Sequence, residues 1–272
     1  MRNTSKVPAP KLSVLLAVNK IDAYLQLAID SILAQTYRDF EFLIICNGSK
    51  RYEIERFIND NYSDTRIVIE CLSLEGLTFA LNYGIEIAKG VYIARHDGDD
   101  VSFQTRFEKQ LFFLESNPEY GVVGCIVQMI DEHGSILPDK FLFQESHESI
   151  TNLLPIYNSL CHPALMFRRD ALLKVNGYLY GYFSEDHDLF IRLAHNTIYK
   201  FKNLPEILFQ YRRHSNQLTA QNLTKVFSEV SAIHFINIFQ RKNYKSLLGI
   251  IWVLPPVIIF KRFIRRCIRR LR

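Results

Sequence analysis

The chain has 272 residues, 48% of them apolar and 22% charged, which is ordinary for a globular protein with a substantial core. Its formal net charge is +5, but the last twelve residues hold seven Lys or Arg side chains and no acid. The rest of the chain is therefore close to neutral, which argues against a nucleic-acid-binding body. The length favours one large α/β domain, alone or with an appendage.

The cysteines and the N-terminus bear on the compartment. Residues 1–11 are short and polar, and the apolar run after them has only the length of a strand, so we expect no signal peptide. The five cysteines show no paired metal-ligand spacing, and several lie in apolar runs (Cys46, Cys71, Cys125, Cys161 and Cys267). We therefore expect buried free thiols in a reducing compartment.

Strand and helix patterns alternate through the first 100 residues. This alternation predicts a mainly parallel sheet with right-handed crossovers, as in a nucleotide-binding half. Apolar, β-prone runs predict strands at 12–18, 40–46, 66–70 and 91–94. Helical spacing predicts helices at 25–33 behind an Asp22 N-cap, at 51–61, and at 76–89 with Gly90 as the closing residue.

Polar residues follow three of these strands, and we expect them to meet at one edge of the sheet. Asn19 follows the first strand, Asn47 and Ser49 end the second, and Asp97 and Asp99 follow the fourth. With Asp100, the last group places three carboxylates within four residues, a cluster that suits Mg²⁺ or Mn²⁺ holding phosphate. The alternatives are an acidic surface turn for the cluster and a helix-capping role for Asp100.

The second half of the chain changes pattern. A helix is expected at 103–115, an apolar strand at 120–130 with a turn at 131–134, and a short strand within 160–168. An aromatic, glycine-bearing loop at 178–184 then leads to acidic residues that open a helix at 189–195, and a strand follows at 207–211. This α+β pattern is expected for an acceptor-binding half at 119–218, after a nucleotide-binding half at 11–118.

The tail, residues 219–272, is expected to be a helical membrane-association segment. Residues 247–260 are apolar, but they are too few to span a bilayer and Pro255-Pro256 interrupts them. In 260–271, apolar residues recur at helical spacing with arginine pairs on the opposite face, which predicts an in-plane helix on an anionic membrane. A helix docked on the protein itself and a re-entrant hairpin are the alternatives.

Several linked motifs, spread over about residues 11–215, resemble the inverting family 2 glycosyltransferases of the GT-A fold. The matching pieces occur in the expected order along the chain. They are residues 12–19, 29–37, 47–49, 80–85, 97–100, Arg106 with Gln110, 161–163, and Glu185-Asp186-x-Asp188.

The resemblance implies a role for each matched residue. Asp186 would be the catalytic base, assisted by Glu185, although helix capping is an alternative for Asp186. Asp99, Asp97 and His214 would hold Mn²⁺ or Mg²⁺, with a structural role as the alternative for His214. Acceptor contacts would come from His162 and Glu185. Nucleotide-sugar contacts would come from Ala17, Asn19, Asn47, Asn82, Asp97, Asp99 and Arg212, with Arg213 as the alternative to Arg212 at the diphosphate.

One departure concerns the nucleotide base. Many members of the family carry Asp-Asp at the end of the second strand, where this chain has Cys46-Asn47. Asn47 can still hydrogen-bond a base but carries no charge, so the resemblance supports UDP by analogy.

The resemblance implies metal-dependent, inverting transfer of glucose or galactose from a UDP-sugar to an undecaprenyl-diphosphate-linked N-acetylhexosamine. The linkage would be β-1,3, in O-antigen or capsule assembly, at the cytoplasmic face of the bacterial inner membrane. One rival is a nucleotidyl or phosphoryl transferase, which would need a phosphate loop that residues 19–22 do not supply. The other is a membrane-tethered scaffold with a decayed site.

Overall fold

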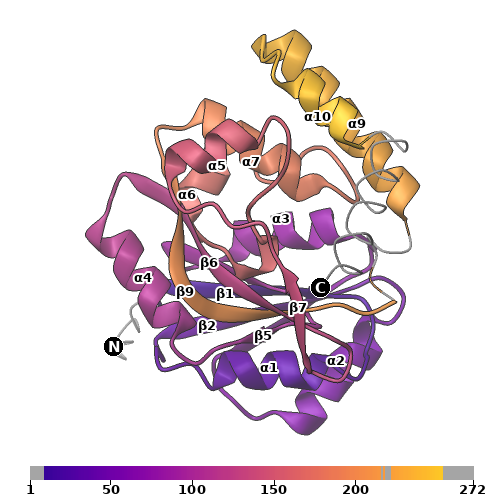
Figure 1. Cartoon of the computed structure of the whole chain (residues 1–272). Coiled ribbons are helices and arrows are strands. Elements are labelled where there is room, and N and C mark those ends of the chain that lie inside the picture. Colours follow the sequence, from indigo (N-terminus) through magenta and orange to yellow (C-terminus); the bar gives the residue numbers. More distant parts are fainter. Residues whose placement is uncertain (1–8, 216, 218–221, 254–272) are drawn as a thin grey trace, which may run out of the picture.

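The computed structural model describes residues 9–215, 217 and 222–253. Within them, one curled, mixed sheet runs through the body in the order β3-β2-β1-β4-β8-β6-β9-β5, with β7 paired to β6 (Figure 1). The strands are β1 (Leu12–Val18), β2 (Phe40–Asn47), β3 (Ile67–Leu72), β4 (Tyr92–His96), β5 (Val101–Ser102), β6 (Tyr120–Ile130), β7 (Ile136–Lys140), β8 (Met166–Arg168) and β9 (Lys200–Arg212).

Helices cover both faces of this sheet. The apolar side chains of α1, α2 and α4 pack on one face, and those of α3, α5, α6 and α7 pack on the other. β1 shows why, because Leu12, Val14 and Leu16 join the first core and Leu15 joins the second. The helices are α1 (Leu25–Leu33), α2 (Arg51–Asn61), α3 (Leu77–Ile87), α4 (Arg106–Ser116), α5 (His147–Leu153), α6 (Arg169–Lys174), α7 (Glu185–Asn196), α9 (Leu223–Arg241) and α10 (Ser246–Val253).

The predicted parallel sheet is confirmed in the first half, where β3, β2, β1 and β4 are parallel neighbours. The second half makes the sheet mixed, because β8 lies antiparallel between β4 and β6, while β9 runs parallel to β6. A 3₁₀ turn at His162–Ala164 leads directly into β8. The antiparallel strand β8 therefore brings residues 161–164 to the end of β4.

Two predicted helix boundaries were wrong. Asp22 is not the N-cap of α1, because the helix begins at Leu25 and Asp22 instead accepts a hydrogen bond from the Tyr24 amide (3.0 Å). Gly90 does not close α3, which ends at Ile87. A Cβ atom on Gly90 would lie 2.5 Å from the Ser13 nitrogen, so glycine is needed there for the close approach of the chain to β1.

A buried arginine, Arg106, holds together the main-chain segments that lie beneath the candidate site. Arg106 donates from Nη2 to the carbonyls of Arg95 (2.8 Å) and Leu165 (3.2 Å), and from Nε to Gln110 (3.1 Å). Gln110 in turn donates to the Ala164 carbonyl (2.8 Å). These two side chains of α4 therefore tie the end of β4 to the 3₁₀ turn, and satisfy carbonyl groups that would otherwise be buried without partners.

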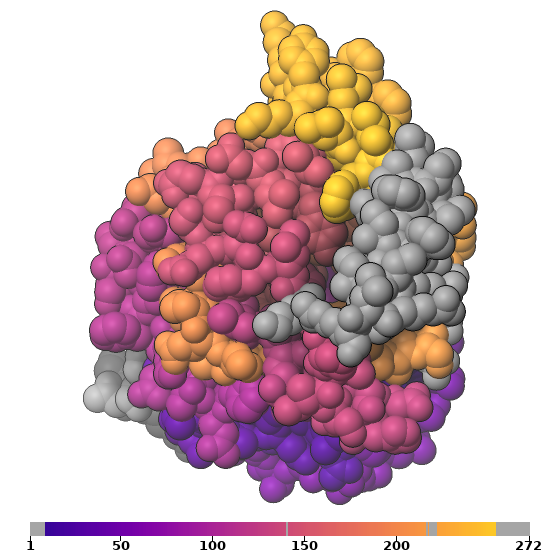
Figure 2. Space-filling view, in the orientation of Figure 1, coloured from indigo at the N-terminus to yellow at the C-terminus, as the bar shows by residue number. Residues whose placement is uncertain are grey.

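The helices α9 and α10 lie side by side and project from the body (Figure 1). In the space-filling view they rise above the rest of the molecule (Figure 2). In the described part of the chain, no helix combines the length and the apolar character needed to cross a bilayer. The amphipathic helix predicted at 260–271 lies outside the described residues.

Candidate active site

A cavity of about 720 Å³ opens at the carboxyl ends of β1, β2 and β4. The strand-end residues Ala17, Asn19, Asn47, Asp97 and Asp99 line one side, as the parallel arrangement predicted. Ser49 lies on the surface and does not line the cavity. The opposite side is lined by residues of the second half, which include His162, Glu185 and Asp186. Ala17 and Asp186, 169 positions apart in the chain, therefore face one cavity.

The acidic cluster follows β4. Asp97, Asp99 and Asp100 each offer one carboxylate oxygen, and these oxygens all lie within 4.8 Å of one another. Burial and the neighbouring Asp97 raise the pKa of Asp99, and burial with Asp99 raises the pKa of Asp100 well above its ordinary value. One oxygen of Asp100 is buried without a hydrogen-bond partner. The set of mutually repelling hard oxygen ligands fits a divalent cation such as Mn²⁺ or Mg²⁺.

His214 joins this cluster from beyond the end of β9. Its Nε2 lies 2.9 Å from Asp99 Oδ2, and its ring packs 5.0 Å from that of Tyr24. The structure therefore brings together the three residues predicted to hold the metal. Asp100 does not cap a helix, because α4 begins only at Arg106; its carboxylate accepts instead from the Arg212 amide (2.8 Å).

Two predicted nucleotide-sugar residues do not line the cavity. Arg212 is buried, and its side chain donates to the carbonyls of Asp99 (2.8 Å) and Asp131 (3.1 Å). Asn82 exchanges two hydrogen bonds with the main chain of Tyr178, both 2.8 Å long. Both side chains therefore hold loops that border the site.

Asn47 lines the cavity, but half of the hydrogen-bonding capacity of its side-chain amide is taken up by protein contacts. Its Nδ2 donates to the Val18 carbonyl and its Oδ1 accepts from the Gly76 amide, both at 3.1 Å. One amide hydrogen and one lone pair are left for a ligand. The side chain therefore joins the ends of β1 and β2 to the start of α3.

On the opposite side, Glu185 and Asp186 are the first two residues of α7, which begins four residues before the predicted helix. Asp186 accepts from Asn158 Nδ2 (3.0 Å) and from the His187 amide (2.7 Å), so it combines a helix-start contact with a cavity-facing position. Burial raises the pKa of Asp186. Burial and the neighbouring Asp186 raise the pKa of Glu185 to about 8. Asp188 lies outside the cavity and pairs with Arg192 at 2.7 Å.

His162 completes this side of the cavity. Its Nε2 lies 2.6 Å from the Tyr178 hydroxyl, and burial lowers its pKa well below the ordinary value. A neutral imidazole that is hydrogen-bonded to a tyrosine can form part of the wall of an acceptor pocket, but it is a poor general base. His162 lines the cavity, and its acceptor contact stays a prediction.

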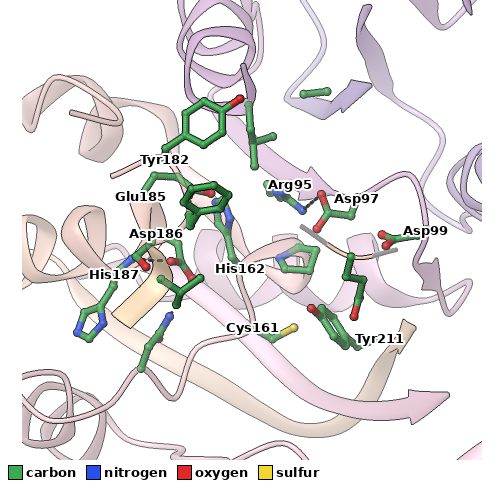
Figure 3. A pocket seen from close by; sticks show the side chains of 18 of the residues that line it. Arg95, Asp97, Asp99, Cys161, His162, Tyr182, Glu185, Asp186, His187 and Tyr211 are labelled. Carbon is green, nitrogen blue, oxygen red and sulfur yellow. Dashed lines mark hydrogen bonds and ion pairs between the residues drawn. The ribbon is translucent and has the colours of Figure 1, made fainter. Parts of the chain in front are cut away.

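Arg95 was missed in the sequence, although an arginine inside an apolar strand next to an acidic motif is an available signal. It is 3% exposed and forms an ion pair with Asp97 across the cavity floor. Its Nη1 is the nitrogen paired with Asp97, whereas its buried Nε has no hydrogen-bond partner. Figure 3 shows Arg95 between Asp97 and Asp99 on one side and Glu185 and Asp186 on the other. A polar ligand in the cavity could accept a hydrogen bond from the Arg95 Nε.

Glu185→Gln is expected to stabilise the ligand-free protein, increasingly as the pH rises. Glu185 has a pKa of about 8 in the folded chain and an ordinary value near 4.5, so folding favours its protonated form. The contribution of Glu185 to the free energy of unfolding is fully present below about pH 4.5 and is lost as the pH rises toward 8. Glutamine stays neutral over the whole range. Urea unfolding at pH 5 and pH 8 should show the advantage of the variant growing by up to about 3 kcal/mol. An equal difference at both pH values would contradict this.

Comparison with known proteins supplies the family. Residues 14–176 match the sequence model of glycosyl transferase family 2. The O-antigen biosynthesis glycosyltransferase WbnJ of Escherichia coli is 36% identical over 244 residues, which cover 89% of this chain and 94% of WbnJ. The amylovoran biosynthesis glycosyltransferase AmsE of Erwinia amylovora is 28% identical over 71% of this chain and 72% of its own.

Two solved structures share the fold at low sequence identity. S. aureus TarS (residues 1–349), in complex with UDP-GlcNAc, has a TM-score of 0.63 at 14% identity, over 84% of this chain and 67% of that chain. The mannosyltransferase PcManGT from Pyrobaculum calidifontis, in complex with GDP-Man and Mn²⁺, has a TM-score of 0.62 at 17% identity, over 92% and 74%. These likenesses establish the GT-A architecture.

Proposed function

The chain belongs to glycosyl transferase family 2, and from that premise we propose which transfer it performs. The donor is a UDP-sugar that carries glucose or galactose. The acceptor is an undecaprenyl-diphosphate-linked N-acetylhexosamine, extended by a β-1,3 linkage during O-antigen or surface polysaccharide assembly. The observation that carries the proposal is one cavity with an Asp97–Asp99–His214 cluster on one side and the Glu185–Asp186 pair on the other.

This arrangement suits a single displacement with inversion. The acceptor hydroxyl oxygen forms a bond to the anomeric carbon while the bond from that carbon to the diphosphate oxygen breaks, and UDP leaves. In this proposal Asp186 takes the hydroxyl proton from the side opposite the acidic cluster. Its raised pKa makes it a stronger base than an ordinary aspartate. Asp97, Asp99 and His214 would hold a divalent cation, which would supply charge neutralisation for the departing diphosphate.

The residues between the two sides suit a hydroxylated hexose. Arg95, whose Nε has no hydrogen-bond partner, lines the cavity between the two carboxylate groups that the transferred sugar would have to reach. The choice of UDP is supported by TarS, whose structure holds UDP-GlcNAc, while PcManGT, whose structure holds GDP-Man, shows that the fold admits another base. The relation to WbnJ and AmsE supports a role in polysaccharide assembly.

A lipid-linked acceptor calls for a surface that meets the bilayer, and the projecting pair α9–α10 supplies one. Its exposed side chains include several large apolar ones, and the Phe235 and Phe239 rings stack on each other (6.5 Å between centroids). The same pair lines the cavity through Val226, Phe227 and Val230. We assign this face to the anionic cytoplasmic surface of the bacterial inner membrane, where the protein would bind peripherally.

Replacing Phe239 and Leu248 together by serine is expected to release the protein from membranes. These side chains are 78% and 53% exposed, so the change costs little folding stability, while each buried apolar side chain contributes about 2 kcal/mol to membrane binding. Sedimentation with vesicles of anionic lipid should show at least a tenfold loss of binding. Phe112→Ser is the matched control, because Phe112 is 72% exposed on α4. Equal binding of the double variant and wild type would contradict the assignment.

A UDP-release assay tests the proposed function. It combines the full-length protein, Mn²⁺, a panel of nucleotide sugars and synthetic diphosphate-lipid GlcNAc or GalNAc. We expect acceptor-dependent UDP release from one donor and its loss with EDTA. Release of pyrophosphate from a nucleoside triphosphate would instead favour the nucleotidyl transferase. Neither turnover nor Mn²⁺-dependent UDP binding would favour the scaffold.

A further inference from the structure

One carboxylate of α9 holds the main chain that immediately precedes the candidate base. Glu229 Oε2 accepts hydrogen bonds from three consecutive amides, those of Tyr182 (2.9 Å), Phe183 (2.8 Å) and Ser184 (3.1 Å). The next two residues are Glu185 and Asp186. A single carboxylate oxygen of α9 therefore fixes the main chain that enters α7.

These three amides need an acceptor. Residues 182–184 lie outside any helix or strand, and all three line the cavity. Ser184 stands at the N-cap position of α7, but its side chain makes no capping bond, and its buried Oγ has no partner. Glu229 therefore supplies an acceptor to the N-cap amide and to the two amides before it, at a helix start where negative charge is favoured.

The loop has few other restraints close to the base. Gly181 has a φ of +91°, and a Cβ atom there would lie 2.9 Å from the Glu185 nitrogen, so the chain turns tightly against the helix start. The Thr78 hydroxyl reaches the Gly181 carbonyl at 3.5 Å, the outer limit of a hydrogen bond. Lys225, one turn before Glu229, lies over the Phe183 ring at 5.5 Å. The strong contacts to residues 182–184 therefore come from α9.

We propose that Glu229 is a positioning residue for the transfer: by holding the amides of 182–184, it sets the carboxyl groups of Glu185 and Asp186 against the bound donor. The inference rests on the proposed function for the identity of the reaction. Charge-assisted bonds to three amides orient a loop more firmly than neutral ones. Because α9 also bears part of the exposed apolar face, the placement of this helix and the geometry of the base are linked through one side chain.

The test compares Glu229→Gln and Glu229→Ala with wild type, and uses Ser228→Ala on the exposed side of α9 as the control. Glutamine keeps a carbonyl oxygen for the amides but removes the charge, whereas alanine removes both. The readouts are kcat for sugar transfer, Kd for UDP with Mn²⁺, the thermal midpoint, and hydrogen exchange of the peptide that contains residues 182–184. We expect kcat to fall about 10²-fold in Glu229→Ala and less in Glu229→Gln, because a small misplacement of a catalytic group has an effect of that size.

UDP affinity should stay close to wild type in both variants, while in Glu229→Ala the thermal midpoint falls modestly and amide exchange at 182–184 accelerates. A kcat equal to that of Ser228→Ala would overturn the inference. A parallel loss of UDP affinity, thermal midpoint and kcat would overturn it as well, because that pattern marks a merely structural contact. Absence of transfer by wild type would instead overturn the proposed function, and the exchange data would still test the Glu229 contact.

Discussion

Asp186→Asn should abolish sugar transfer while UDP still binds with Mn²⁺. An amide cannot accept the acceptor's proton, and general-base catalysis typically contributes about 10²–10⁴-fold. The donor side lies across the cavity from Asp186, so calorimetric binding of UDP should change little. The same assay on Asp170→Asn, an exposed aspartate of α6, gives the control.

The variant also has a structural signature. Asp186 uses both oxygens, one for Asn158 and one for the His187 amide, and asparagine can serve only one of them. A stability loss of about 1 kcal/mol should therefore accompany the loss of activity. If UDP binding disappears together with transfer, the assignment of Asp186 as the base is wrong.

Asp99→Asn should remove the metal dependence of the site. It takes away one charge of the acidic cluster and one of the oxygens that would bind the metal, so Mn²⁺ should no longer strengthen UDP binding. Transfer should fall by about 10²–10³-fold, the usual effect of losing one electrostatic contact to a developing charge. Calorimetry with and without Mn²⁺, alongside exposed Asp60→Asn as control, measures this.

The metal-free protein should tolerate the same change well. The pKa of Asp99 is raised because its charge is buried beside Asp97, so a neutral amide relieves repulsion in the absence of a cation. The thermal midpoint of the metal-free variant should therefore equal or exceed that of wild type, and Mn²⁺ should raise it only in wild type. A variant that keeps full Mn²⁺ dependence would exclude Asp99 as a ligand.

The donor side of the site followed from the sequence because parallel strands impose a common edge. Once β1, β2 and β4 were predicted, Asn19, Asn47, Asp97 and Asp99 had to lie together. The mixed second half was harder to predict, since the short strand β8 pairs with β4 across about 70 residues of chain and leaves little local pattern. The family resemblance placed His162, Glu185 and His214 where strand patterns could not.

What the sequence could not supply was the direction of individual polar side chains. Arg212 follows a strand toward the site, but unpaired carbonyls of Asp99 and Asp131 take its donors. Asn82 likewise serves the main chain of Tyr178, which is 96 residues away. The role of Glu229 could not be predicted either, because the three consecutive amides point to one oxygen only in the folded, irregular loop.

The Arg106–Gln110 network has a consequence for building hybrid enzymes. Both side chains belong to the first half, yet they donate to the carbonyls of Leu165 and Ala164 in the second. A recombination crossover near residue 118 would separate donors from acceptors chosen for each other, and would leave buried groups unmatched. Exchanging acceptor preference between relatives therefore calls for grafting loops 156–158 and 178–186 onto an intact sheet. Residues 161–168 should then come from the same parent protein as Arg106 and Gln110.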